Sequence, residues 1–218
     1  MRILVLAVGV LAGCGVVPAA VTQAETAPLS MKFAVMRGDA QIGTNTIELS
    51  YNGGQTSVRI ATHLEVTIAF VKLYRFDQTE TEQWSNGRLQ SLSSRTDDNG
   101  KMHRVDAVSR QGKMVVDGDG QLRVADAAIL PVSLWSRPAP DHGFGLDPEG
   151  GSIVPVFVTD KGEDDMVVAG RTRYAHHFVV KTTFSRDVWY DERGRLIRVK
   201  MQVRDGSTIH YEPIGLRG

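Results

Sequence analysis

The stretch Val58-Arg59-Ile60-Ala61-Thr62-His63-Leu64-Glu65-Val66-Thr67-Ile68-Ala69-Phe70 decides the fold. Every second residue from Val58 to Phe70 is apolar or Thr, whereas the residues between them include Arg, His and Glu. A period of two places the two sets on opposite faces of a β-strand, while a helix would spread both sets around its circumference. The stretch therefore predicts a long strand with one apolar and one polar face.

The length of this strand predicts a curved sheet. At about 3.3 Å per residue the stretch would extend roughly 40 Å, which is long for a strand of a globular protein. After Phe70 the apolar positions change phase to Val71 and Leu73. We expect a β-bulge near Phe70 to produce this change of phase and to bend the strand.

Turn signals recur roughly every 8–15 residues along the rest of the chain, as an antiparallel meander requires. Asn, Asp and Gly dominate these signals because hairpin turns need positive φ angles. The signals are Gly38-Asp39, Asn52-Gly53-Gly54, Asn86-Gly87, Asn99-Gly100, Gln111-Gly112, Asp119-Gly120, Lys161-Gly162, Ala169-Gly170, Asp191 to Gly194 and Asp205-Gly206. We predict an all-β protein, an antiparallel meander of about a dozen strands that forms a curled sheet or half-open barrel.

The regular spacing is interrupted by a long insertion that is rich in Pro and Gly, at residues 125–152. Its first part, Ala125–Leu130, predicts a short helical turn before Pro131. Long connections of this kind inside a compact domain are unusual and often functional. A plain connector between two parts of the sheet and a lid over a pocket are both compatible with the sequence.

The N-terminal residues have the pattern of an export signal. Arg2 is followed by the apolar run Ile3–Leu11. A membrane span needs about 20 apolar residues, and Pro18 interrupts this run earlier. We predict an export signal over residues 1–24 and a single β domain over residues 25–218.

Two processing sites fit this segment. Leu11-Ala12-Gly13-Cys14 matches the bacterial lipobox, in which Cys14 is lipidated and the lipoprotein signal spans residues 1–13. Thr22-Gln23-Ala24 instead offers the small residues that an ordinary signal peptidase requires. Either site predicts an exported protein, free in the periplasm or anchored to the outer membrane as a lipoprotein. Contact with the membrane is expected only through a lipid anchor on Cys14.

Composition narrows the classes of partner. The 218 residues include 25 Lys plus Arg and 25 Asp plus Glu, so the formal net charge is zero. Binding to phosphate backbones needs a concentrated excess of basic residues, and we therefore expect no nucleic-acid partner. A single Cys excludes a disulfide scaffold.

Motifs for catalysis, metals and cofactors are absent from the sequence. There is no G-x-S-x-G, no P-loop and no G-x-G-x-x-G. His176 and His177 are adjacent, so on a strand they point to opposite faces and do not chelate one metal. Asp117–Gly120 resembles part of a calcium loop but lacks the later ligands, which favours a hairpin turn. We predict no enzyme, no metal site and no cofactor.

Glu80 and Glu82 are the carboxylate pair with a spacing suited to chemistry. Residues two apart on a strand share one face, and paired carboxylates serve in glycoside hydrolysis. We expect both to be solvated on an outward face, with Arg75 or Arg95 on a neighbouring strand. An enzyme that acts on an envelope glycan is the alternative.

The leading interpretation is a non-enzymatic cell-envelope protein that binds a hydrophobic or amphipathic ligand, or an envelope partner, inside the curled sheet. Lipid-carrying envelope proteins use a half-closed barrel and a lid for this purpose, and such cavities are mostly apolar. A filled core is equally compatible with the residues. The predicted apolar cavity is lined by Ile60, Leu64, Val66, Ile68, Phe70, Trp135, Phe157, Phe178 and Trp189. A scaffold whose strand edge recruits another protein is a further alternative.

Four segments carry a family resemblance. They are Ser94–Gly100, Leu130–Trp135, Phe184–Leu196 and Gly206–Tyr211. In these segments the chain resembles a bacterial family of exported β-rich proteins, periplasmic or lipoprotein, of unknown function. The resemblance implies antiparallel β structure in the envelope and carries over no activity and no catalytic residue.

Overall fold

The computed structural model describes residues 26–68, 71–139, 143–168, 170–203 and 205–214. Thirteen strands form one antiparallel sheet in the order β12-β13-β14-β15-β16-β1-β2-β3-β4-β5-β6-β7-β8. The first eight are β1 (Thr26–Arg37), β2 (Ala40–Asn52), β3 (Gln55–Ile68), β4 (Val71–Ser85), β5 (Arg88–Asp98), β6 (Lys101–Arg110), β7 (Lys113–Gly118) and β8 (Gln121–Asp126). The last five are β12 (Phe157–Val168), β13 (Arg171–Lys181), β14 (Ser185–Tyr190), β15 (Leu196–Gln202) and β16 (Thr208–Pro213). The all-β antiparallel prediction is confirmed.

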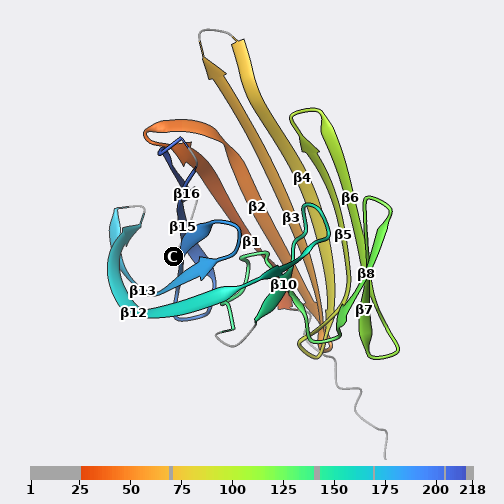
Figure 1. Cartoon of the computed structure of the whole chain (residues 1–218). Coiled ribbons are helices and arrows are strands. Elements are labelled where there is room, and N and C mark those ends of the chain that lie inside the picture. Colours follow the sequence, from red (N-terminus) through yellow and green to blue (C-terminus); the bar gives the residue numbers. More distant parts are fainter. Residues whose placement is uncertain (1–25, 69–70, 140–142, 169, 204, 215–218) are drawn as a thin grey trace, which may run out of the picture.

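The sheet curls but does not close, and β8 and β12 form its two edges. The first strand lies near its middle, since β1 pairs with β2 on one side and with β16 on the other. The chain between the two edges forms a small sheet of β9 (Leu130–Pro131), β10 (Phe144–Leu146) and β11 (Ile153–Pro155). In Figure 1, β10 lies between β12–β13 and the long strands β4 to β6. The Pro/Gly-rich insertion thus spans the opening of the curled sheet.

The predicted hairpins are present except at Lys161-Gly162, which lies inside β12, where Gly162 has a φ angle of 84° at a bulge next to Asp160. The turn residues of the other hairpins have the expected backbone. Asn86 and Gly87 have φ angles of 49° and 74°, and Asn99 and Gly100 have 53° and 90°. Two successive residues with positive φ give a turn whose twist matches that of the flanking strands. The Asn-Gly pairs therefore fix the registers of β4 with β5 and of β5 with β6.

The alternation of the long strand is confirmed along β3. Val58 and Ile60 are buried, whereas Arg59, Ala61 and His63 are exposed. The buried residues lie on the inner face of the curled sheet, and the exposed residues face solvent.

The expected bulge near Phe70 is wrong in its position. β3 ends at Ile68 and β4 begins at Val71, so the chain reverses there, and residues 69–70 lie outside the described part. Val66 pairs with Tyr74 but Thr67 pairs with Lys72, which leaves one extra residue on β4. The change of phase in the sequence marks a change of strand, which alternation alone does not distinguish from a bulge.

The helical turn expected at Ala125–Leu130 is also wrong. β8 continues to Asp126, whose side chain accepts a hydrogen bond from the Ala128 N–H at 2.8 Å. An Asp side chain that bonds the backbone two residues later closes a tight turn. The chain then enters β9 at Leu130, and no described residue is helical.

The described residues contain no helix that is long and apolar enough to cross a membrane.

Candidate functional site

Around Glu82 the large side chains of the sheet interior are buried, and this carboxylate ties the insertion to them; we call this region the filled end. Glu82 Oε2 accepts hydrogen bonds from the indole N–H groups of Trp84, at 2.6 Å, and Trp135, at 2.7 Å. Glu82 Oε1 accepts a hydrogen bond from the Ser133 hydroxyl. The two indole rings meet edge to face, with centroids 5.6 Å apart. Because Ser133 and Trp135 belong to the insertion, these contacts fix it against β4.

The placement predicted for Glu80 and Glu82 is wrong. Both side chains are buried, at 2% and 0% exposure, on the inner face of β4. They pair across to Ile60 and Val58 of β3, which are also buried. The inner face takes the even-numbered positions of this part of β4, and the intervening residues face solvent.

The surroundings of Glu80 change its protonation. Burial raises the pKa of Glu80 well above its usual range, and the charge of Glu82 and a hydrogen bond with it raise the pKa further. Glu80 therefore keeps its proton where an exposed glutamate would lose it. The oxygens of Glu82 instead accept hydrogen bonds from three donors.

A cavity of about 420 Å³ lies next to Glu80, under the insertion. The long strands supply its floor, the insertion covers one side, and β14 to β16 close the other. Its lining from β2 to β4 is Asn45, Ile47, Ile60, Thr62, Leu64, Tyr74, Phe76, Gln78 and Glu80. The insertion and the segments after β13 add Val132, Ser133, Leu134, Asp147, Pro148, Glu149, Val154, Thr182, Thr183, Phe184, Arg186, Leu196, Val199, Met201 and Tyr211. We call this space the inner cavity.

A second hollow of about 320 Å³ adjoins the inner cavity and is more apolar. Four residues line both spaces: Leu64, Tyr74, Met201 and Tyr211. The remaining lining of the second hollow is Val35, Arg37, Ile42, Val66, Val203, Asp205 and Ile209. We call it the apolar chamber. The two spaces therefore adjoin at these four side chains, one space with more polar walls and the other with more apolar walls.

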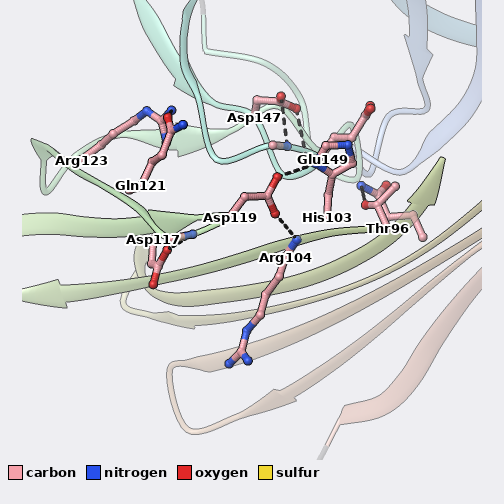
Figure 2. A network of polar contacts seen from close by, with 12 residues as sticks. Thr96, His103, Arg104, Asp117, Asp119, Gln121, Arg123, Asp147 and Glu149 are labelled. Atoms are coloured by element: carbon pink, nitrogen blue, oxygen red, sulfur yellow. Dashed lines mark hydrogen bonds and ion pairs between the residues drawn. The ribbon is translucent and has the colours of Figure 1, made fainter. Parts of the chain in front are cut away.

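Charged groups gather on the insertion side of the inner cavity. The Asp147 carboxylate accepts hydrogen bonds from the backbone N–H groups of Glu149, at 3.1 Å, and Gly150, at 3.3 Å (Figure 2). Burial raises the pKa of Glu149, and the charges of Asp147 and Asp98 raise it further. Burial lowers the pKa of Arg186, although Asp147 and Glu149 act in the opposite direction. The inner cavity thus holds charges of both signs.

Three side chains that line the inner cavity have a polar atom that is buried and lacks a hydrogen-bond partner among the described residues. They are Asn45 Oδ1, Glu80 Oε1 and Arg186 Nη1. The Arg186 guanidinium also lies over the Phe184 ring, with 4.6 Å between its Cζ and the ring centroid. A buried polar group without a partner is unfavourable by about 1–3 kcal/mol, more if charged. Three such groups around one cavity are typical of a binding site rather than of a core.

The insertion approaches the sheet closely where it carries these groups. A Cβ atom built on Gly118, at the end of β7, would lie 2.4 Å from the Gly150 carbonyl oxygen. Nearby, the Asp119 carboxylate contacts the His103 ring at 2.5 Å and the Arg104 backbone N–H at 2.7 Å (Figure 2). Only Gly at position 118 allows the loop with Asp147 and Glu149 to rest on the sheet.

Some of the nine predicted cavity residues lie at this site. Ile60 lines the inner cavity, Leu64 lines both spaces, and Val66 lines the apolar chamber. Phe70 lies outside the described residues, as does the side chain of Ile68.

The other four predicted cavity residues lie elsewhere. Trp135 lines two other hollows, one of about 660 Å³ with Leu29 and Met31 and one of about 60 Å³ with Trp84. Phe178 packs in the core against Tyr190, with ring centroids 6.1 Å apart. Phe157 is 63% exposed on the edge strand β12. Trp189 stacks on His177, with centroids 4.3 Å apart, on the face opposite to the buried Tyr190. Phe157 and Trp189 are corrections, because an apolar ring on a strand was expected to face inward.

The remaining sequence motifs have structural roles. His176 and His177 contact different carboxylates, Asp160 at 2.7 Å and Asp187 at 2.8 Å. Asp117 caps the β7–β8 hairpin through the Gly120 N–H at 2.8 Å. Within the described ranges there is no group of three or more His, Cys, Asp or Glu that could hold a metal. Cys14 lies outside them.

The polar lining was missed in the sequence, although a signal for part of it existed. Asn45 and Thr62 occupy the inward phase of their strands, where the other positions are apolar, and Asn45 donates to Thr62 at 2.9 Å. Arg186 has the same parity as the buried Val188 and Tyr190. A polar residue in an inward position was the available indication of a cavity wall. The contribution of Asp147 and Glu149 has no such signal, since a loop has no phase.

Comparison with known proteins places the chain in a family and supports the fold. A search of the curated proteins finds no match. A crystal structure of a β-barrel-like protein of the domain of unknown function DUF1849, from Brucella abortus, is similar, with a TM-score of 0.60 and 12% identity. The similarity covers 86% of this chain and 95% of that one. The family described as a domain of unknown function, DUF6134, matches residues 33–214. The chain belongs to the DUF6134 family.

Proposed function

We propose that this protein is a non-enzymatic cell-envelope protein that binds an amphipathic ligand inside its curled sheet. The observation that carries the proposal is the pair of adjoining spaces, of about 420 and 320 Å³, one with polar and one with apolar walls. An amphipathic molecule matches both, with its polar part in the inner cavity and its chain in the apolar chamber.

The apolar chamber can supply most of the binding free energy. Each methylene removed from water contributes about 0.8 kcal/mol, so a medium-length acyl chain gives useful affinity even after the loss of ligand freedom. The side chains that would contact the chain include Val35, Leu64, Val66, Met201 and Ile209. The insertion supplies one wall of the polar part of the site, with Ser133, Asp147 and Glu149.

The predicted export signal supports a location in the periplasm or, as a lipoprotein, at the outer membrane. A lipid or another hydrophobic molecule of the envelope is then the nearest source of ligand. No nucleic acid is expected as a partner, since the formal net charge is zero.

A glycan-acting enzyme is the second candidate, and the buried Glu80–Glu82 pair is the observation that favours it. A carboxylic acid with a raised pKa beside a carboxylate is the arrangement of an acid–base pair. However, Glu82 does not line the inner cavity, and three donors occupy its oxygens. The carboxylate is thus turned toward the insertion, which supports binding over catalysis.

The proposal is tested with a variant in which a larger side chain fills part of the apolar chamber. We expect monolaurin to bind the wild-type protein in calorimetric titration below its micellar concentration. Leu64→Trp places a larger side chain in both spaces and is expected to weaken binding at least tenfold. The matched control is Ala61→Trp, on the exposed face of the same strand, with unchanged affinity. Absence of wild-type binding, or equal affinity of the Leu64 variant, would contradict the proposal.

A further inference from the structure

The inner cavity offers hydrogen-bonding groups of both kinds to the head of a ligand. Arg186 Nη1 is a donor without an acceptor, whereas Asn45 Oδ1 and Glu80 Oε1 are acceptors without a donor. These statements concern partners among the described residues. A ligand that satisfies all three must carry at least one acceptor and at least one donor.

The charged residues that line the inner cavity also favour a ligand head that carries both an anionic and a cationic group. Among the described residues, Arg186 is the one Lys or Arg that lines the inner cavity, and Asp147 and Glu149 are carboxyls of the same lining. An anion without a cationic group would pair with Arg186 but lie near Asp147 and Glu149. A cation alone would pair with these carboxyls but lie near Arg186. Buried charges are favourable only when they are paired.

The surrounding residues fix where each part of the head would lie. Arg186 stands on β14 with its guanidinium over the Phe184 ring, opposite the strands that carry Asn45 and Glu80. Asp147 shapes the turn of the insertion loop by accepting hydrogen bonds from two backbone N–H groups of that loop. The loop rests on the sheet where Gly150 approaches Gly118. The acceptor and donor sites are therefore on different walls of one cavity.

From these groups, and on the basis of the proposed function, we infer that the ligand is a single-chain amphiphile with a zwitterionic head. A phosphate or carboxylate of the head pairs with Arg186. An ammonium group next to it donates to the acceptors of the opposite walls and faces the carboxyls of the insertion. The acyl chain extends past Leu64 and Met201 into the apolar chamber.

The experiment compares four ligands with the same twelve-carbon acyl chain. Lauroyl lysophosphatidylethanolamine and O-lauroylserine are zwitterionic, with a phosphate and a carboxylate respectively. Lauroyl lysophosphatidic acid is anionic, and monolaurin is neutral. We expect at least one zwitterion to bind tenfold or more tightly than the anion and the neutral ligand, and the stronger of the two identifies the acidic group.

Variants test the assignment of Arg186. Arg186→Gln is expected to reduce the affinity for the preferred zwitterion at least tenfold and that for monolaurin less than threefold. The control is Arg104→Gln, because the Arg104 guanidinium is exposed and points away from the insertion (Figure 2). We expect this variant to bind all ligands with unchanged affinity. A circular-dichroism spectrum and melting temperature for each variant establish that it is folded.

The outcomes separate the two proposals. If monolaurin binds as tightly as the zwitterions, the head-group inference is wrong and the amphiphile-binding function stands. If lysophosphatidic acid binds most tightly, the role of the carboxyl groups is wrong. If none of the four ligands binds the wild-type protein, the proposed function itself fails.

Discussion

The two ends of the sheet interior use the same strands and the same alternation but differ in how they are filled. Near Glu82, large side chains occupy the space: Leu89 and Leu92 are 1% exposed, and Trp84 meets Trp135 of the insertion. The hollow of about 660 Å³ at this end is lined by Trp135 but not by Glu82. Toward the β3–β4 hairpin, at the top of Figure 1, Leu64 and Tyr74 border open volume. The pattern of inward and outward residues defines a wall, and the partner supplied by the insertion decides whether that wall encloses a core or a cavity.

The two ends also differ in whether their buried polar groups have hydrogen-bond partners. All donors around Glu82 converge on its two oxygens, whereas Glu80, two residues earlier on the same face, has an oxygen without a partner in the described part of the chain. A polar network inside a protein is stable when every member is paired. The filled end therefore serves stability, and the hollow end keeps unpaired groups for a ligand.

Removal of the Glu82 carboxylate is expected to have the largest effect. Glu82→Leu leaves the buried Trp84 N–H and the half-buried Trp135 N–H and Ser133 hydroxyl without an acceptor, which destabilises the fold by about 3–5 kcal/mol. Urea denaturation followed by tryptophan fluorescence measures the loss. Glu48→Leu, at an exposed position on the outer face, is the control and should change stability by less than about 0.5 kcal/mol. A loss below 1 kcal/mol for the Glu82 variant would contradict the role of the filled end.

Larger side chains at both ends test the comparison directly. Leu92→Phe overpacks the filled end and is expected to destabilise the protein by about 1–3 kcal/mol. Leu64→Phe extends into open volume and should change stability by less than about 0.5 kcal/mol, because no neighbour has to move. Denaturation midpoints of the two variants decide the matter. Equal losses would mean that the two ends are packed alike.

The sequence predicted the sheet because alternation and turn chemistry are local. Val58 and Ile60, like the positive-φ pair Asn86-Gly87, behave as their pattern indicates. The faces of β4 were also readable, since Phe76 and Trp84 have the same parity as Glu80 and Glu82. We predicted that Glu80 and Glu82 face outward because they carry charge, although their parity in the strand indicated the inner face.

The site itself could not be predicted in full. Its walls combine residues far apart in sequence, and the loop with Asp147 and Glu149 is placed by a backbone contact between Gly118 and Gly150. No periodicity encodes such a contact. Whether apolar positions enclose a cavity depends on the volume that the insertion leaves empty, which composition does not reveal.

The pH dependence of the free energy of unfolding tests whether the pKa of Glu80 is raised in the folded protein. Since burial raises the pKa of Glu80 above its ordinary value of 4.5, the folded protein binds more protons than the unfolded chain as the pH rises through that range. The stability contributed by the protonated acid is complete below the unfolded pKa and is lost toward the folded pKa, by up to about 1.4 kcal/mol per pH unit. Glu80→Gln keeps the shape and removes the titration.

We expect wild-type stability to fall from about pH 5 to pH 7 more steeply than that of Glu80→Gln, measured by urea denaturation at each pH. Glu149, whose pKa burial also raises, contributes a slope of the same sign to both proteins and cancels in the difference. Parallel curves for the two proteins would show that Glu80 has an ordinary pKa in the folded state.

The smallest effect is expected for Trp135→Phe, which removes one donor to Glu82 but keeps the aromatic contact with Trp84. The loss of one hydrogen bond to a buried carboxylate destabilises the protein by about 1 kcal/mol or somewhat more. Because Ser133 still bonds Glu82, the insertion should stay in place but open more often. Hydrogen exchange of the amides of residues 130–136 is expected to accelerate several-fold, while exchange in β5 is unchanged. Uniform acceleration across the sheet would instead indicate that the insertion unfolds only with the whole protein and is not a separately opening cover.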